Sequence, residues 1–148
     1  MGKYCSLLFC LLIVGCGSQA LPGAGIDSSL TRCGPRMASI LVGDGFFQIQ
    51  CGCSGVGEEP GTTFSSSTGA LNCHLPTRDS QVFFYFQGVL RHSILSTGGN
   101  RFNSSPLSDP SAAIFFRSHV AFFNVPAVYP FQEGLSGLTG TIVVPVSP

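Results

Sequence analysis

The stretch QVFFYFQ at residues 81–87 carries the strongest secondary-structure signal in this sequence. Five aromatic or β-branched residues follow one another between two glutamines, and Gly88 ends the run. Such side chains favour extended backbone, and glycine often marks the end of a strand. The stretch therefore predicts a β-strand.

Further apolar runs lie on both sides of this stretch, separated by turn residues. They predict strands at residues 38–42, 46–53, 70–75, 91–96 and 139–146, and one or two strands within 113–125. The tripeptide Gly43-Asp44-Gly45 predicts a hairpin turn. No amphipathic helix, repeat or heptad is visible. Short strands at this spacing predict an all-β domain over residues 38–148, folded as a Greek-key sandwich or barrel.

The composition excludes one class of partner. Charged residues make up 9% of the 148 residues, and seven basic side chains balance seven acidic ones. Soluble domains average about a quarter charged residues. Because no basic face is available to neutralise phosphates, we expect no nucleic acid partner.

The first residues predict export. Lys3 precedes an apolar run at residues 7–14 that is too short to span a bilayer, so residues 1–15 are interpreted as a signal peptide. The following IVGC at residues 13–16 resembles the lipobox of bacterial lipoproteins, which implies acylation of Cys16. Ordinary cleavage after Ala20, at a small-x-small site, is the alternative and would release a soluble secreted protein. We favour lipidation and a location in the cell envelope.

Residues 16–37 are rich in glycine, serine and proline and show no apolar period. They are interpreted as a lipidated cysteine followed by a flexible tether. The membrane, reached through the lipid, is thus one predicted partner. A protein or small-molecule partner is not identified by the sequence.

Four cysteines remain if Cys16 is lipidated, namely Cys33, Cys51, Cys53 and Cys73. In an oxidising compartment they predict two disulfides, for which three connectivities exist. Cys51 and Cys53 lie two apart, on the same face of a predicted strand, so they are poorly placed to pair with each other. We expect Cys73 to join one of them and Cys33 the other.

A metal site is the alternative use of these cysteines. Thiolates of Cys51, Cys53 and Cys73, with the neighbouring His74, have residue types that hold zinc or copper(I). Export favours the disulfides.

Three segments in the second half of the chain resemble the cupredoxins, the plastocyanin and azurin family. They are QVFFYFQGVLRHSI at 81–94, RFNSS at 101–105 and VPAVYPFQEGLSGLTGTIVV at 125–144. In the first segment His92 takes the place of the first copper-binding histidine. The resemblance implies a cupredoxin-like β-sandwich.

The copper-ligand loop departs from the family. Counting back from Gly140, the methionine position holds Leu138. The histidine position then holds Glu133 and the cysteine position Pro130. Counting forward through the segment instead puts the cysteine position at Phe131 or Glu133. Neither count places a copper-binding thiolate in the loop at residues 126–139.

A type 1 copper site needs two histidines, a cysteine thiolate and a weak axial ligand. No cysteine follows Cys73 and no histidine follows His119. The resemblance therefore implies a scaffold without blue copper and without the electron transfer that depends on it.

His92 and Glu133 are the remaining candidates for a metal site. An imidazole and a carboxylate would suit copper(II) or a harder ion, with little colour. The simpler interpretation, which we favour, makes His92 a partly exposed histidine at a strand end and Glu133 an exposed loop residue. His119 is expected to form a hydrogen bond within the fold, and Glu58 to lie in a solvated turn.

No catalytic constellation is visible, since the metalloprotease, nucleophile-elbow and phosphate-loop motifs are all missing. We therefore expect no enzyme and no cofactor, with copper as the possible exception. The first functional hypothesis is an anchored, non-catalytic binding or structural module. The second is a copper-binding cupredoxin relative that uses His92 with non-standard ligands.

Overall fold

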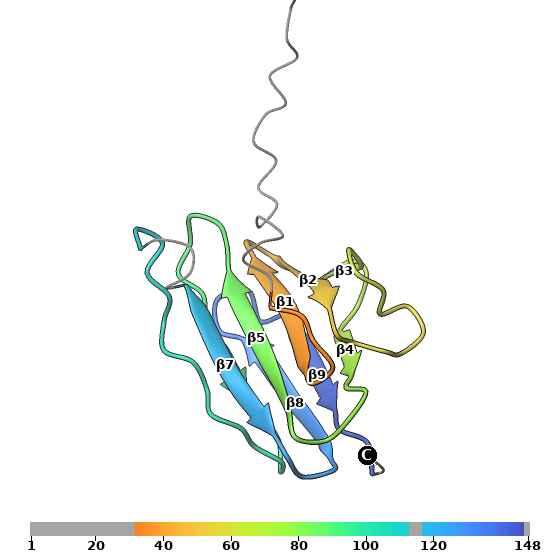
Figure 1. The fold of residues 1–148 in the computed structure, drawn as a ribbon. Helices are drawn as coiled ribbons and strands as arrows, with labels where there is room; N and C mark the ends of the chain where they lie inside the picture. The colour runs from red at the N-terminus through yellow and green to blue at the C-terminus, as the bar shows by residue number, and fades with distance from the viewer. Residues whose placement is uncertain (1–31, 113–116, 147–148) are drawn as a thin grey trace, which may run out of the picture.

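A computed structural model describes residues 32–112 and 117–146 (Figure 1). The predicted signal peptide, the cleavage sites and Cys16 lie outside these ranges. The strands are β1 (Met37–Gly43), β2 (Phe46–Cys51), β3 (Thr63–Ser65), β4 (Leu71–His74), β5 (Ser80–Phe86), β6 (Ile94–Ser96), β7 (Ser118–Phe123), β8 (Val128–Glu133) and β9 (Thr139–Val143). The described residues contain no helix, and hence none long and apolar enough to cross a membrane. The predicted all-β class is confirmed.

The strands form two mixed sheets that pack face to face (Figure 1). One has the order β3-β2-β1-β5-β7 and the other the order β4-β9-β8-β6. β1 runs parallel to β5 and β4 runs parallel to β9, whereas the other pairs are antiparallel. The chain crosses repeatedly between the two sheets, as expected of a sandwich.

The main core lies between the sheets and is rich in aromatic rings. Alternate residues of β1 point into it, as the two-residue period of a strand requires. Phe131 from β8 packs edge-on against Phe84 and Phe47 of the opposite sheet, with ring centroids 5.4 and 5.5 Å apart. Edge-to-face contacts of this kind stabilise a core beyond the area that they bury.

A second apolar cluster lies on the outer face of the five-stranded sheet. Leu41, Phe83 and Tyr85 form it and are at most 4% exposed, with Met37, Phe46 and Val120 packed against them. β5 contributes Phe84 to the main core and Phe83 and Tyr85 to this outer cluster, so it is buried on both faces. This explains why residues 81–87 read as a continuous apolar run and not as an alternating one.

Two strands were missed in the sequence, and others differ in extent. The predicted loop at residues 126–139 contains β8, so the true connection to β9 is only residues 134–138. Proline is uncommon inside a strand because it has no N–H to donate, yet Pro130 lies within β8. The Pro130 carbonyl accepts a hydrogen bond from the Thr97 N–H, and Thr97 lies just past the end of β6. No residue within β6 therefore needs an N–H from position 130. The three-residue β3 carried too little pattern to predict.

The two disulfides are Cys33–Cys51 and Cys53–Cys73, with Cα atoms 6.0 and 4.9 Å apart. This is one of the two pairings expected from the sequence. The expectation that Cys51 and Cys53 share one strand face is wrong. β2 contains an irregularity near its end, and Gly52 follows with φ +80°. A bulge and a left-handed residue redirect neighbouring side chains, so Cys51 lies on the outer side and Cys53 packs against the core.

Candidate functional site

His92 lies just before β6 and is 1% exposed, so the expectation of a partly exposed histidine is wrong. The long loop before β7 covers it. In that loop Ser108 accepts a hydrogen bond from the His92 N–H through its Oγ (2.8 Å) and donates one from its own N–H to the His92 carbonyl (2.7 Å). The imidazole stacks on Phe86, with ring centroids 6.4 Å apart.

Glu133 is the last residue of β8 and is also 1% exposed. The expectation of an exposed loop residue is wrong because β8 extends to this position, where Glu133 pairs with Ile94 of β6. Its Oε2 accepts hydrogen bonds from the Leu135 N–H (3.0 Å), the Ser136 N–H and the Ser136 hydroxyl (2.7 Å). The loop that follows β8 is thus folded around this carboxylate.

The structure brings His92 and Glu133 together. His92 Nδ1 lies 3.3 Å from Glu133 Oε1, which also accepts the Ser93 N–H at 3.4 Å. The two residues are 41 positions apart in the chain. The sequence resemblance suggested that they could be neighbours, and the pairing of β6 with β8 makes them so.

A second carboxylate, Asp44, faces the other side of the imidazole. His92 Nε2 lies 2.9 Å from Asp44 Oδ1. Asp44 belongs to the predicted hairpin turn between β1 and β2, and its Oδ2 accepts the Val89 N–H at 3.3 Å. A Cβ atom at Gly88 would lie 2.3 Å from Asp44 Oδ1, so the lack of a side chain there permits the approach.

The arrangement limits what the two ring nitrogens of His92 can do. An imidazole nitrogen can bond to a carboxylate only if it carries a proton. Both contacts are therefore hydrogen bonds at once only in the doubly protonated ring, a cation between two anions. In that form neither nitrogen has a lone pair to give to a metal ion. The two carboxylates also lie at different ring nitrogens, so they do not converge on one ion with the imidazole.

Both carboxyl groups titrate below their ordinary range. Burial raises the pKa of Glu133, but the N–H and hydroxyl of Ser136 and the N–H of Leu135 outweigh it and hold the pKa below 4.5. Burial also raises the pKa of Asp44, but the hydrogen bonds from the Val89 N–H and from His92 have the larger effect and hold this pKa below 3.8. Both groups are therefore ionised at neutral pH.

These shifts predict a loss of stability in acid. The folded protein binds protons at Glu133 and Asp44 less readily than the unfolded chain, so their stabilisation is complete above about pH 5 and is lost as the pH falls through the folded-state pKa values. Each unit by which the pKa of the buried Glu133 is lowered contributes about 1.4 kcal/mol. Asp44 contributes less, because it is exposed and solvent screens its interactions. We expect urea unfolding at pH 7, 5, 4 and 3 to show a nearly constant free energy down to pH 5 and a decline below it.

The matched variant for this experiment is Glu133→Gln, which keeps the shape and cannot ionise. It should be less stable at pH 7 and should show a smaller decline in acid. An equal decline in the variant and the wild type would show that Glu133 does not contribute to the acid sensitivity.

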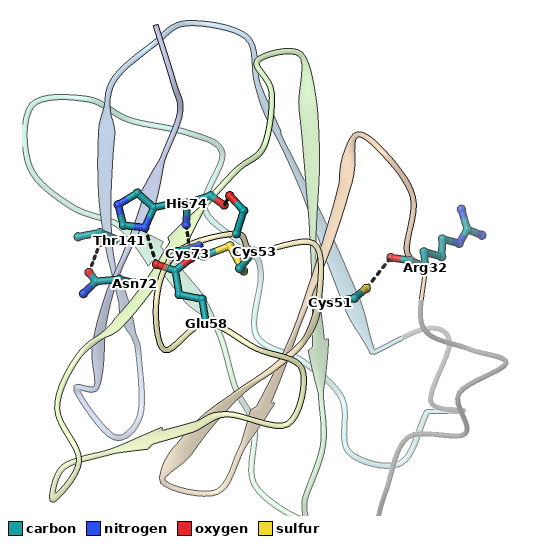
Figure 2. The surroundings of a disulfide bond; sticks show 10 residues. Arg32, Cys51, Cys53, Glu58, Asn72, Cys73, His74 and Thr141 are labelled. Atoms are coloured by element: carbon teal, nitrogen blue, oxygen red, sulfur yellow. Dashed lines mark hydrogen bonds and ion pairs between the residues drawn. A yellow bond between two sulfur atoms is a disulfide. The ribbon is translucent and has the colours of Figure 1, made fainter. Parts of the chain in front are cut away.

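A second buried carboxylate lies beside the Cys53–Cys73 disulfide (Figure 2). Glu58 is 3% exposed, so the expected solvated turn is wrong at this residue. It accepts the N–H groups of Gly55 (2.9 Å) and His74 (2.7 Å) and contacts His74 Nδ1. This cluster holds the 52–62 loop against β4.

The alternative metal site built on cysteines and His74 is not assembled. Its three cysteines, Cys51, Cys53 and Cys73, are all used in disulfides. Cys73 points into the core, whereas the next residue of the same strand, His74, points outward (Figure 2). In the described part of the chain, no group of three or more His, Cys, Asp or Glu side chains is placed to hold a metal ion.

His119 behaves as expected. Its Nε2 lies 2.6 Å from the carbonyl of Asn103, and its ring stacks on Phe84 with centroids 6.5 Å apart. It joins the long loop to β7 and takes no part in the His92 cluster.

Comparisons with known proteins add little to this geometry. No protein-family model matches the chain, and a search of curated proteins finds no relative. Among solved structures, a reduced Cu(I) form of an amicyanin variant at pH 4 matches with 13% identity and a TM-score of 0.38, covering 52% of this chain and 83% of its own. A second amicyanin variant in the Cu(I) form matches with 12% identity and a TM-score of 0.38, over 51% and 82% of the two chains. Similarity this low carries no argument about function.

Proposed function

We propose that this chain is an exported, membrane-anchored, cupredoxin-like domain that acts as a non-catalytic binding or structural module without a type 1 copper site. The observation that carries the proposal is that both ring nitrogens of His92 face carboxylates, at 2.9 and 3.3 Å. A histidine whose two ring nitrogens both face partners within the fold has no free nitrogen to offer a metal ion.

The surroundings of Glu133 support the same role. The sequence resemblance puts this residue among the copper-ligand positions, yet its carboxylate accepts several backbone and side-chain donors. The His92 cluster connects the β1–β2 turn, the segment before β6 and the β8–β9 loop, which are distant in sequence. A buried ionic cluster of this kind fixes the relative positions of the loops at one end of the sandwich.

Exposed apolar side chains lie close in sequence to the residues of this cluster. The N–H groups of Val89 and Leu135 bond to Asp44 and Glu133, and Leu107 precedes Ser108, which bonds to His92; all three apolar side chains are exposed. Exposed apolar residues are candidates for contact with a partner where they come together in one patch. The cluster would hold the backbone that carries these side chains in place.

Copper handling is the second candidate. One observation favours it, because each ring nitrogen of His92 already lies within hydrogen-bond distance of a carboxylate oxygen. Copper(II) accepts nitrogen and oxygen ligands. To bind here it would have to displace a carboxylate and a proton from His92.

Copper titration distinguishes the two candidates. We expect the mature domain to show no strong visible absorption with copper(II), because no described thiol is free to bind it. We also expect calorimetry to give the same weak uptake for the wild type and for His92→Gln. His74→Gln, which alters a half-exposed histidine, is the matched control. Stoichiometric binding that is lost only in His92→Gln would overturn the proposal in favour of copper handling.

Export is supported by the two disulfides, which form and persist in oxidising compartments. The lipid anchor rests on the motif at Cys16. We expect Cys16→Ser to move the protein from the membrane fraction to the soluble fraction, because acylation needs that thiol. Cys10→Ser, within the apolar run of the leader, should leave the distribution unchanged. A Cys16→Ser protein that stays with the membrane would contradict the anchor.

A further inference from the structure

The two disulfides differ in their access to solvent. Cys33 is exposed and Cys51 half-buried, whereas Cys73 is 0% exposed and Cys53, which is also half-buried, packs against the main core. The sequence separations, 18 and 20 residues, are nearly equal. The entropy lost by the unfolded chain on closing each loop is therefore nearly the same for the two disulfides. What distinguishes them is how far solvent and a reductant can reach the sulfur atoms.

The accessible disulfide, Cys33–Cys51, fastens the segment before β1 to the outer face of the five-stranded sheet. Immediately before Cys33, the Arg32 guanidinium lies over the Phe83 ring, 5.5 Å from its centroid. The Arg32 carbonyl accepts a hydrogen bond from the buried Ser39 Oγ at 2.6 Å. Cys51 Sγ lies 3.8 Å from the same oxygen (Figure 2). Where β1 begins, the Arg36 carbonyl accepts the Gln81 N–H at 2.9 Å. Apart from the disulfide, residues 32–36 are thus held to the sheet by contacts of the first and the last of them.

We propose that Cys33–Cys51 is a site of thiol–disulfide exchange, cleaved by an exported dithiol reductant while Cys53–Cys73 stays intact. Both members of the exchange are defined by their chemistry: an exposed protein disulfide and a protein or small molecule with two neighbouring thiols. Cleavage releases residues 32–36 from the sheet and leaves the sandwich folded.

The exchange takes two steps. A thiolate of the reductant attacks the exposed Cys33 Sγ, forming a mixed disulfide as the Cys33–Cys51 bond breaks and Cys51 leaves as a thiolate. The second thiol of the reductant then attacks the mixed disulfide and displaces Cys33. Two electrons pass to the cysteine pair, the reductant ends as a disulfide, and its two protons end on Cys33 and Cys51.

Release changes the reach of the domain. Five further residues would extend the connection by at most about 17 Å. This consequence rests on the proposed anchor at Cys16, whereas the exchange itself does not. Failure of the anchor would leave the selective reduction measurable in the soluble protein.

The test is a reduction time course on the exported protein. It is treated with reduced thioredoxin, which is a protein dithiol, or with dithiothreitol, then alkylated and mapped by mass spectrometry. We expect Cys33 and Cys51 to be alkylated at least ten times faster than Cys53 and Cys73. Hydrogen exchange should rise at residues 32–36 and stay unchanged in β1 and β5.

Two double variants test whether the effects belong to the Cys33–Cys51 disulfide. Cys33→Ser with Cys51→Ser should show the raised exchange at residues 32–36 without reductant. Cys53→Ser with Cys73→Ser should leave the reduction rate of Cys33–Cys51 unchanged if it folds. Equal reduction rates for both disulfides, or reduction of Cys33–Cys51 only together with loss of the sandwich signal in circular dichroism, would overturn the proposal.

Discussion

Replacing Glu133 with alanine is expected to lower the free energy of unfolding by about 3–5 kcal/mol, the usual cost of removing one partner from a buried pair of this kind. The change removes the acceptor for Ser93, Leu135 and Ser136 and leaves His92 with Asp44 as its remaining carboxylate partner. Unsatisfied donors then remain in a site that is 1% exposed. Urea denaturation followed by circular dichroism at pH 7 measures the effect.

Glu59→Ala is the matched control, because Glu59 is an exposed carboxylate. It should change the free energy of unfolding by less than about 0.5 kcal/mol, as is usual at the surface. If Glu133→Ala costs no more than this control, the buried ionic cluster is not what holds the loops at that end of the sandwich.

Replacing Cys73 with alanine is expected to cost about 2–5 kcal/mol, the typical cost of losing a native disulfide in a small secreted domain. Cys73 lies in the main core on β4, which pairs with the last strand β9. Its loss frees Cys53 and leaves space in the core, so the packing term adds to the entropic one. Thermal and urea unfolding of the oxidised protein measure the difference.

Cys33→Ala is the informative comparison for that variant. It opens a loop of nearly the same length, but the bond that it removes lies outside the core. We therefore expect a smaller loss than for Cys73→Ala, with the folded signal retained. A larger loss for Cys33→Ala would mean that the exposed disulfide, and not the buried one, carries the stability of the sandwich.

The sequence predicted the strands wherever local pattern was strong. The runs that became β1, β2, β5 and β9 are rich in β-branched or aromatic residues and are bounded by turn signals. β8 could not be predicted because a proline is disfavoured within a strand. Pro130 is tolerated only because it faces the end of β6, which the sequence does not show. Strand boundaries of that kind depend on the partner and not on the segment itself.

The candidate site was predicted only in part. His92 and Glu133 were singled out together through the family resemblance, but both were expected to be exposed. Asp44 was read only as part of a turn, although it lies 2.9 Å from His92 Nε2. No local pattern could show that contact, because the two residues are 48 positions apart in the chain.

By itself, the sequence determined the all-β class, the strand at residues 81–87 and the number of disulfides, since these follow from side-chain type, periodicity and cysteine count. Only the tertiary structure decided which cysteines pair and what His92 does. Gly52 and the irregularity of β2 turn Cys51 and Cys53 to different sides of the sheet. The packing of three connecting segments places a carboxylate beside each ring nitrogen of His92. Both outcomes depend on contacts between segments far apart in the chain, for which local propensity carries no signal.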